Sequence, residues 1–287
     1  MARRPGERRA KPETRVRVVR VRRGDVAAGR DGVAGEEPLE IRLLAGDRRQ
    51  TVAITMRTPG ADFELAAGFL FGEGVIASRD QIAGIRYCTD VEEEQRYNVV
   101  NVRLRGDRLP DLERLERHFL VTSACGVCGK AHLDALAVRC DRPLADGPRV
   151  AVDALLGLPD ALRAAQPLFA ATGGLHAAGL FAPDGRLLAL REDVGRHNAM
   201  DKLVGWALLE GRATEGNVVC VSGRASYELL QKAVAARVTF FAAVSAPSSL
   251  AVDLARRFGV TLVGFLRDEG FNVYAGAERI DGLPVGR

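Results

Sequence analysis

The second half of the chain alternates short apolar runs with segments of helical spacing. The apolar runs at 217–222, 239–244 and 260–265 have the length of buried strands. Between them, residues 226–236 and 248–258 place apolar side chains on one face of a helix. Buried strands that alternate with amphipathic helices are typical of a parallel sheet covered on both faces. We therefore predict a layered α/β core of sheet and helices for this half.

Further elements are expected just before these runs. The spacing predicts helices at 151–165 and 198–209, and the first of them ends before Pro167. The turn Pro183-Asp184-Gly185 separates two short apolar segments, 179–181 and 187–190, and so predicts a β-hairpin.

The first half mixes strands with one helix. Residues 39–43 and 51–56 alternate polar and apolar side chains around a Gly-Asp turn, which predicts a hairpin. Residues 63–71 predict a helix, and 97–104 predict another strand. This mixture indicates a smaller α+β N-terminal domain.

Basic residues are concentrated at the start of the chain. Ten Lys or Arg and two Glu lie between Met1 and Arg23, a local charge of +8 in a chain of net charge +4, which leaves −4 for the rest. We predict a disordered basic tail at 1–14 and an edge strand at 15–22, where Arg and Val mostly alternate. Nucleic-acid binding is the weaker alternative, because such proteins usually carry their basic charge on the folded surface. The two predicted domains are then 15–119 and 120–287.

The composition is that of a globular protein. The chain has 287 residues, of which 47% are hydrophobic and 27% are charged. No apolar run approaches the roughly 20 residues that a membrane-spanning helix needs, and no secretory signal is apparent. The cysteines number five, an odd count that argues against a disulfide framework. These features predict a cytoplasmic protein with reduced thiols and no membrane association.

Polar residues follow three of the predicted strands where each one ends. Ser222 and Arg224 follow the first, 245–249 follow the second, and Arg267 lies just after the third. Ligands of open α/β sheets usually bind at this edge, and helix N-termini there favour anions. N-capping explains any single Ser better. Three such ends with two Arg nevertheless predict an anionic, nucleotide-like ligand.

Two histidines lie among glycines and polar side chains. His176 ends the turn 172–176, and His197 lies near the start of a helix rich in polar residues. A lone His is more often structural than functional. We weigh binding and structural roles about evenly for His197, and binding less favourably for His176.

A Cys-x-x-Cys loop is the sharpest chemical motif. Cys125 and Cys128 are each followed by Gly, and Lys130 lies close behind them. Two adjacent thiols suit a redox dithiol, half of a zinc site or a sulfur-carrying thiolate. Two buried structural cysteines fit this polar, glycine-flanked setting poorly.

Zinc and deaminase chemistry can be tested against the motif's surroundings. A structural zinc site usually needs a second Cys or His pair, and only His132, with His118 and Cys140 as additions, lies nearby. A zinc deaminase needs His-x-Glu, and none of the four histidines has Glu two residues later. We therefore predict no metal site. The glycine spacing also suits a thioredoxin-like helix start poorly.

Eight segments, taken in order, resemble one known family. The segments are MRTPGADFELAAGFLFGEGVI, YNVVNVRL, SACGVCG, TGGLHAAGLF, REDVGRHNAMDKLVG, VSGRASYELLQKA, SAPSSLAVDLA and VGFLRDEGFNVY. Over residues 36–280 the chain resembles the FdhD family of sulfur carriers, which formate dehydrogenase activity requires. The resemblance implies a cytidine deaminase-like main domain without the deaminase zinc signature, and a homodimer.

The resemblance also implies a chemistry. A cysteine desulfurase would supply sulfur as a persulfide on Cys125, with Cys128 assisting. The sulfur would pass to the molybdenum cofactor, bis-molybdopterin guanine dinucleotide, before the formate dehydrogenase catalytic subunit receives it. The family's cofactor-binding stretch maps to Phe265, Leu266, Arg267, Asp268, Glu269 and Gly270. Ser222, Arg224, His176 and His197 would add contacts, and GDP would serve as a cofactor fragment.

A second function class stays open. The chain could be a non-catalytic chaperone that binds the cofactor or the apo-enzyme. Its Cys-x-x-Cys loop would then be structural, with or without zinc, so the sequence leaves open whether the chain is an enzyme.

Overall fold

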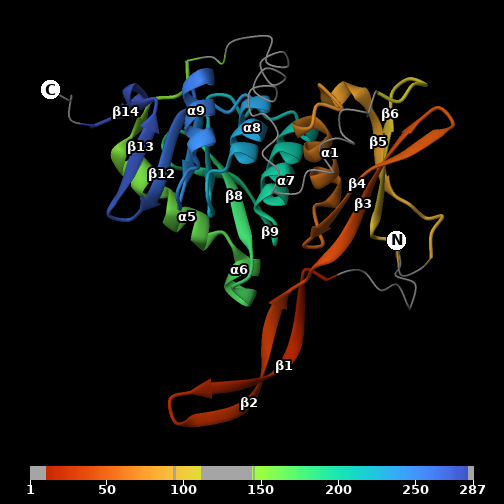
Figure 1. The fold of residues 1–287 in the computed structure, drawn as a ribbon, viewed down its shortest axis with the longest axis horizontal. Helices are drawn as coiled ribbons and strands as arrows, with labels where there is room; N and C mark the ends of the chain where they lie inside the picture. Colours follow the sequence, from red (N-terminus) through yellow and green to blue (C-terminus); the bar gives the residue numbers. More distant parts are fainter. Residues whose placement is uncertain (1–10, 93–94, 111–143, 145, 284–287) are drawn as a thin grey trace.

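The computed structural model describes residues 11–92, 95–110, 144 and 146–283. Two β-sheets with their helices lie next to each other, and an N-terminal hairpin projects away from both (Figure 1). This mixed α/β arrangement agrees with the predicted fold class. A specific likeness to cytidine deaminases stays a prediction.

The N-terminal sheet has four strands in the order β4-β3-β6-β5. Its strands are β3 (Glu37–Ala45), β4 (Arg48–Arg57), β5 (Ile82–Tyr87) and β6 (Val99–Leu104). Helix α1 (Asp62–Gly72) packs on one face, where alternate residues of β3 are fully buried. The predicted β3–β4 hairpin and helix are confirmed. Strand β5, which follows the short 3₁₀ turn Arg79–Gln81, was not predicted.

The second sheet has six strands in the order β13-β12-β11-β10-β8-β9. Its strands are β8 (His176–Phe181), β9 (Leu187–Asp193), β10 (Val218–Val221), β11 (Phe240–Ala243), β12 (Thr261–Arg267) and β13 (Gly270–Ala275). Strands β10, β11 and β12 are parallel, as predicted, but β8, β9 and β13 are antiparallel. The hairpin predicted at 179–181 and 187–190 is confirmed as β8–β9, and the sheet is mixed rather than wholly parallel because hairpins supply its outer strands.

Helices cover both faces of this second sheet. On one face lie α7 (Arg196–Leu209), α8 (Tyr227–Ala235) and α9 (Ser249–Phe258), and on the other lie α4 (Val152–Leu156) and α5 (Leu158–Ala164). The predicted single helix at 151–165 is wrong, because the chain breaks at Gly157 into two helices. Strand β7 (Val150–Ala151) pairs with β14 (Ile280–Asp281), which follows the 3₁₀ turn Ala277–Arg279. Val150 and Ile280 of this pair are buried in the same core as α4 and α5. No helix in the described ranges has both the length and the apolar character to cross a membrane.

The N-terminal hairpin pairs β1 (Glu13–Arg22) with β2 (Asp25–Ala34). It reaches out from the rest of the molecule, and helix α6 (Pro167–Thr172) contacts both of its strands (Figure 1). Strand β1 begins at Glu13, so the tail predicted at 1–14 extends two residues too far. Residues 1–10 lie outside the described ranges.

Candidate functional site at the carboxyl edge of the second sheet

The carboxyl ends of β10, β11 and β12 meet at one edge of the sheet. The loops that follow β10 and β11 are joined by backbone hydrogen bonds, including Ala225 N to Ala246 O at 3.2 Å. The Ser245 carbonyl in turn accepts from the N–H of Phe265 at 3.1 Å. The three predicted strand ends therefore form one continuous edge.

Ser222 and Arg224 take different positions at this edge. The Ser222 hydroxyl accepts a hydrogen bond of 2.9 Å from the backbone N–H of Ala177 and so ties β10 to β8. Arg224 is exposed, and its side chain has no hydrogen bond or ion pair within the described part of the chain. Of the two predicted ligand residues, Arg224 is the one whose side chain is free to meet an anion.

His197 belongs to a three-residue polar cluster. Its Nε2 lies 3.1 Å from Glu228 Oε2 and 3.3 Å from Ser226 Oγ. The hydrogen bond from His197 lowers the pKa of Glu228, although burial opposes this effect. The cluster joins the N-termini of α7 and α8, so it holds an ionised carboxylate and an imidazole at the sheet edge.

His176 lies at the start of β8, beside the loop after β10. A Cβ on Gly223 would stand 3.4 Å from His176 Nδ1, so glycine allows the imidazole to approach this loop. Burial lowers the pKa of His176, and electrostatic interactions with Arg196 and His197 lower it further. The Nε of Arg196 is buried and has no hydrogen-bond partner within the described residues. The two predicted histidines thus lie at the same edge, with a partly unsatisfied guanidinium beside them.

The serines that begin α8 and α9 are helix caps. Ser226 Oγ accepts from Leu229 N at 3.5 Å, and Ser248 Oγ accepts from Ala251 N at 3.3 Å. The capping interpretation is therefore correct for both.

The predicted cofactor-binding stretch forms the end of β12 and the turn into β13. Phe265 is 40% exposed and adopts a φ of 53°, a backbone region that is strained for a bulky side chain. Leu266 points into the core, whereas Arg267, Asp268 and Glu269 are exposed. A hollow of about 600 Å³ is lined by Phe265, Arg267, Asp268, Glu269, Gly270, Phe271 and Asn272. Leu266 can therefore contribute only backbone contacts, and the turn itself carries one more acidic than basic residue.

Sequence reasoning missed a buried ion pair that fixes the start of α7. Lys202 Nζ lies 2.7 Å from Asp193 Oδ2, and both side chains are almost fully buried. Lys202 also donates to the Thr58 carbonyl at 2.8 Å, while Asp193 accepts from the Thr58 N–H at 3.1 Å. These contacts among Lys202, Asp193 and Thr58, which we call the Asp193 clasp, join the N-terminal sheet to the helix that carries His197. The available signal in the sequence was Lys202 itself, a charged residue on a predicted helical face whose other residues are mostly apolar.

The Cys-x-x-Cys loop lies outside the described residues. Cys125 and Cys128 are therefore not placed, nor are the neighbouring Lys130, His118, His132 and Cys140. Cys88 and Cys220 are free and buried, and burial raises the pKa of Cys220 to about 12. Within the described residues, no cluster of three or more His, Cys, Asp or Glu could hold a metal ion.

Comparisons with known proteins cover nearly the whole chain. The family model described as the FdhD/NarQ family matches residues 34–281. The sulfur carrier protein FdhD of Streptomyces coelicolor is 54% identical over 93% of this chain and 95% of its own length. The protein of that name from Nocardia farcinica is 50% identical over 95% of this chain and 96% of its own length.

A solved structure supports the same relationship. The crystal structure of a formate dehydrogenase accessory protein from Desulfotalea psychrophila has a TM-score of 0.71 and 29% identity. It covers 93% of this chain and is itself covered to 99%. With a family model spanning most of the residues and relatives at about half identity, the chain belongs to the FdhD/NarQ family.

Proposed function

We propose that this protein is a sulfur carrier that serves formate dehydrogenase. The observation that carries the proposal is the near full-length similarity to proteins named sulfur carrier protein FdhD. The sequence also contains Cys125-Gly126-Val127-Cys128, a motif suited to holding sulfur on a thiolate.

The sulfur would enter by thiol–persulfide exchange. The Cys125 thiolate attacks the outer sulfur of a persulfide on a cysteine desulfurase, the donor's S–S bond breaks, and the donor cysteine leaves as a thiolate. Cys125 then carries one additional sulfur atom, and no external oxidant or reductant is needed. Cys88 and Cys220 are poor alternatives because both are buried.

The recipient would be the molybdenum cofactor, bis-molybdopterin guanine dinucleotide, bound as substrate. Its pyrophosphates suit the exposed Arg224 and the histidine-lined sheet edge. Arg267 and the exposed ring of Phe265 would meet the nucleotide at the β12–β13 turn. A homodimer would present two equivalent sites to the two guanines of one cofactor.

Mass spectrometry after incubation with a cysteine desulfurase and cysteine tests the sulfur-carrier proposal. We expect the protein to gain one sulfur atom on Cys125, and Cys125→Ala to lose both this gain and the rescue of formate dehydrogenase in cells. Cys128→Ala should impair rescue less. Cys220→Ala is the matched control, because its thiol is buried away from solvent and should not carry sulfur. Full rescue by Cys125→Ala would refute the proposal.

A further inference from the structure

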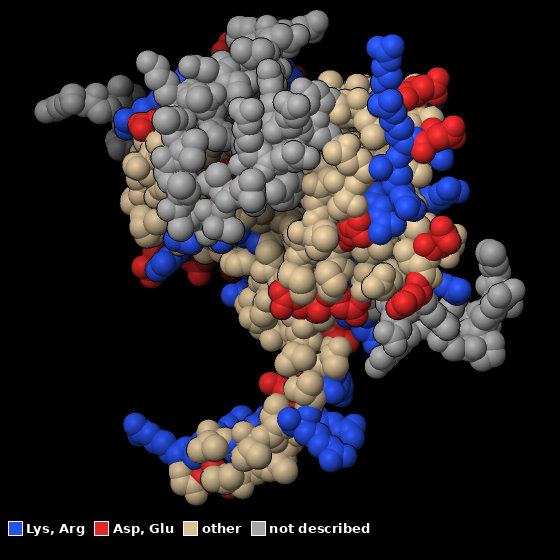
Figure 2. All heavy atoms as spheres, turned by 45° about the vertical axis from the view of Figure 1, so that its right-hand side comes forward, with Lys and Arg blue, Asp and Glu red and all other residues tan. Residues whose placement is uncertain are grey.

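The N-terminal sheet has a second face that α1 does not cover. Four arginines lie on this face: Arg42, Arg49, Arg86 and Arg103. We call it the outer arginine face. The strand register places Arg86 and Arg42 on either side of Asn101, and it places Arg103 beside Leu44. In Figure 2, which brings this side forward, Lys and Arg side chains stand over the sheet with acidic side chains beside them.

Most of the positive charge on this face is not neutralised. Arg42 is paired with Glu40 through two contacts of 2.7 Å. Among the described residues Arg86 has no ion pair, Arg49 acts on the Glu40 carboxylate without forming an ion pair, and Arg103 reaches only the Gly46 carbonyl at 3.4 Å. Asp47 and Asp107 lie in the turns beyond the strand ends rather than on the face. The outer arginine face therefore carries guanidinium groups available to an anionic partner.

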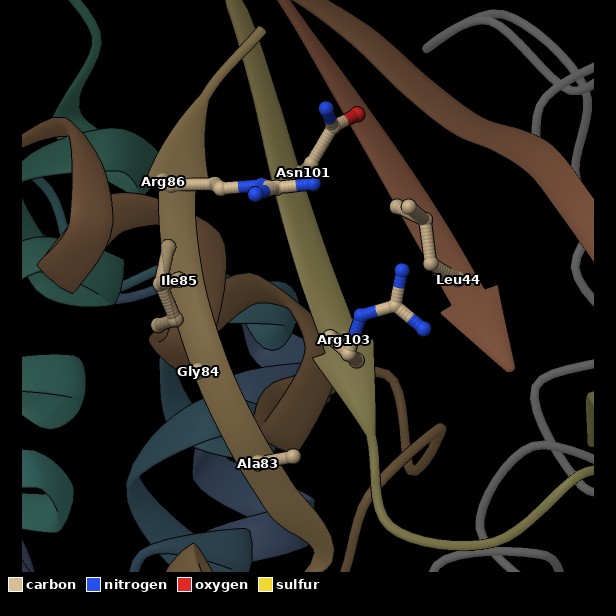
Figure 3. Close-up of a pocket in the computed structure, with 7 residues that line it drawn as sticks. All are labelled: Leu44, Ala83, Gly84, Ile85, Arg86, Asn101 and Arg103. Atoms are coloured by element: carbon tan, nitrogen blue, oxygen red, sulfur yellow. The ribbon is translucent and has the colours of Figure 1, made fainter. Parts of the chain in front are cut away.

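A hollow of about 220 Å³ lies on this face. Figure 3 shows the side chain of Arg86 extending toward Asn101, with Arg103 between β6 and Leu44. All seven lining residues come from three neighbouring strands: Leu44 from β3, Ala83, Gly84, Ile85 and Arg86 from the β5 segment, and Asn101 and Arg103 from β6. The described residues thus supply a floor without an opposite wall.

Asn101 is the second observation that points to a ligand. It lines the hollow and is only 7% exposed, yet its Oδ1 has no hydrogen-bond partner within the described part of the chain. An unsatisfied buried polar atom costs about 1–3 kcal/mol, and an apolar residue at this strand position would avoid that cost. A polar side chain kept here at the expense of stability is typical of a binding position.

We propose that the outer arginine face binds an acidic peptide segment of a partner protein. Arginines without an ion-pair partner suit the carboxylates of such a segment. The Asn101 amide suits a peptide group, because both donate and accept hydrogen bonds. Small-molecule sites usually enclose about 70–90% of their ligand, which a one-walled hollow cannot do. An extended segment anchored on a larger partner fits the open face. The surface lies on a different sheet from the carboxyl edge, so the inference is independent of the proposed function.

Fluorescence anisotropy on the full chain tests this inference. The probe is a fluorescein-labelled peptide of alternating Glu and Ser, and the matched probe carries Gln in place of each Glu. We expect the Glu peptide alone to bind, and Arg86→Gln with Arg103→Gln to weaken it by at least about tenfold. The control pair, Arg212→Gln with Arg256→Gln, removes two exposed arginines elsewhere and should leave the affinity unchanged.

Asn101→Leu provides an independent arm. This variant should keep or raise the Tm, because it removes an unsatisfied amide, and it should weaken the Glu peptide. Equal binding of the Gln peptide, or unchanged affinity in either the arginine pair or Asn101→Leu, would overturn the proposal. Inorganic phosphate that competes as strongly as the peptide would overturn it too, because the face would then be a site for small anions.

Discussion

Gly68 of α1 and Gly205 of α7 lie against each other where the two helices cross. A Cβ added to Gly68 would overlap the carbonyl oxygen of Asp201, and a Cβ added to Gly205 would overlap that of Glu64. The relationship is reciprocal, since the backbone nitrogen of each glycine also lies 2.8 Å from the Cβ position of the other. Neither residue needs glycine for its backbone conformation, because both lie inside regular helices. The glycines therefore serve close packing between the N-terminal sheet's helix and the helix that carries His197.

Gly68→Ala and Gly205→Ala should each destabilise the protein. In an isolated helix, Gly→Ala stabilises by roughly 0.5–1 kcal/mol. Here the added methyl must push two backbones apart, so we expect a loss of at least about 2 kcal/mol. Thermal or urea unfolding measures the change. Gly84→Ala in β5 is the control, because its Cβ would meet no atom within 4 Å, and it should be at least as stable as the parent. Stability equal to the parent in both helix variants would contradict the close packing.

Lys232 of α8 neutralises two carboxylates near the same crossing. Its Nζ lies 2.8 Å from Asp201 and 3.3 Å from Glu73, and the lysine side chain is 8% exposed. Lys232→Met leaves these carboxylates without their cation, so we expect a loss of about 3–5 kcal/mol at pH 8. Chemical denaturation gives the value. Lys202→Met is a parallel case at the Asp193 clasp, and it should be similarly destabilising.

The deficit of Lys232→Met should depend on pH. Burial raises the pKa of Asp201 from 3.8 to about 6, even though Lys232 lowers it. Between pH 3.8 and about 6 the folded protein therefore holds a proton on Asp201 that the unfolded chain releases. The stabilisation from this proton is full below pH 3.8 and is lost as the pH rises through about 6. Without Lys232 the pKa rises further, so protonation relieves the unpaired charge at a higher pH. The deficit should shrink between pH 8 and pH 5, and a pH-independent deficit would contradict the assignment.

The sequence predicted the central strands of the second sheet better than the outer strands. Residues 217–222, 239–244 and 260–265 become β10, β11 and β12 because continuous apolar runs have few alternatives to a buried strand. Strand β13 was missed because it contains Asn and Gly and is paired on one side only. Strand β2 was missed for a similar reason, since glycine, Asp and Arg interrupt its apolar positions.

At the candidate site, the location of the residues was easier to predict than their side-chain contacts. The strand ends were found because strand polarity puts them at one edge, and the histidines were singled out by the glycines and polar residues around them. The partners of His197 could not be predicted, because spacing relates a residue only to others on its own helix, such as Asp201 four positions later. The structure instead gives Glu228 and Ser226 of the next helix segment. Such contacts depend on how α7 and α8 pack, which local sequence does not specify.

Replacing Arg224 or Arg267 should weaken the binding of GDP. Both side chains are exposed, and a charge-assisted hydrogen bond to phosphate contributes roughly 1.5–3 kcal/mol. Calorimetry should therefore show roughly ten- to hundredfold weaker binding for each Arg→Gln change. Arg256→Gln removes an exposed arginine of α9 and serves as the control. Unchanged affinity in the Arg224→Gln, Arg267→Gln double variant would place the nucleotide elsewhere.

His176 should titrate at a higher pH once Arg196 loses its charge. Burial is the largest cause that lowers the pKa of His176 below 6.5, and Arg196 is the next, while Asp193 opposes them. Arg196→Gln removes the positive charge and leaves the imidazole in place, so its pKa should rise toward the ordinary value. NMR titration of the imidazole Cε1–H signal follows this directly, with His176→Gln used to assign the resonance. Arg224→Gln is the control at the same edge, because its charge does not contribute to the shift. An unchanged midpoint in Arg196→Gln, or an equal shift in both variants, would mean that Arg196 does not set the charge state of His176.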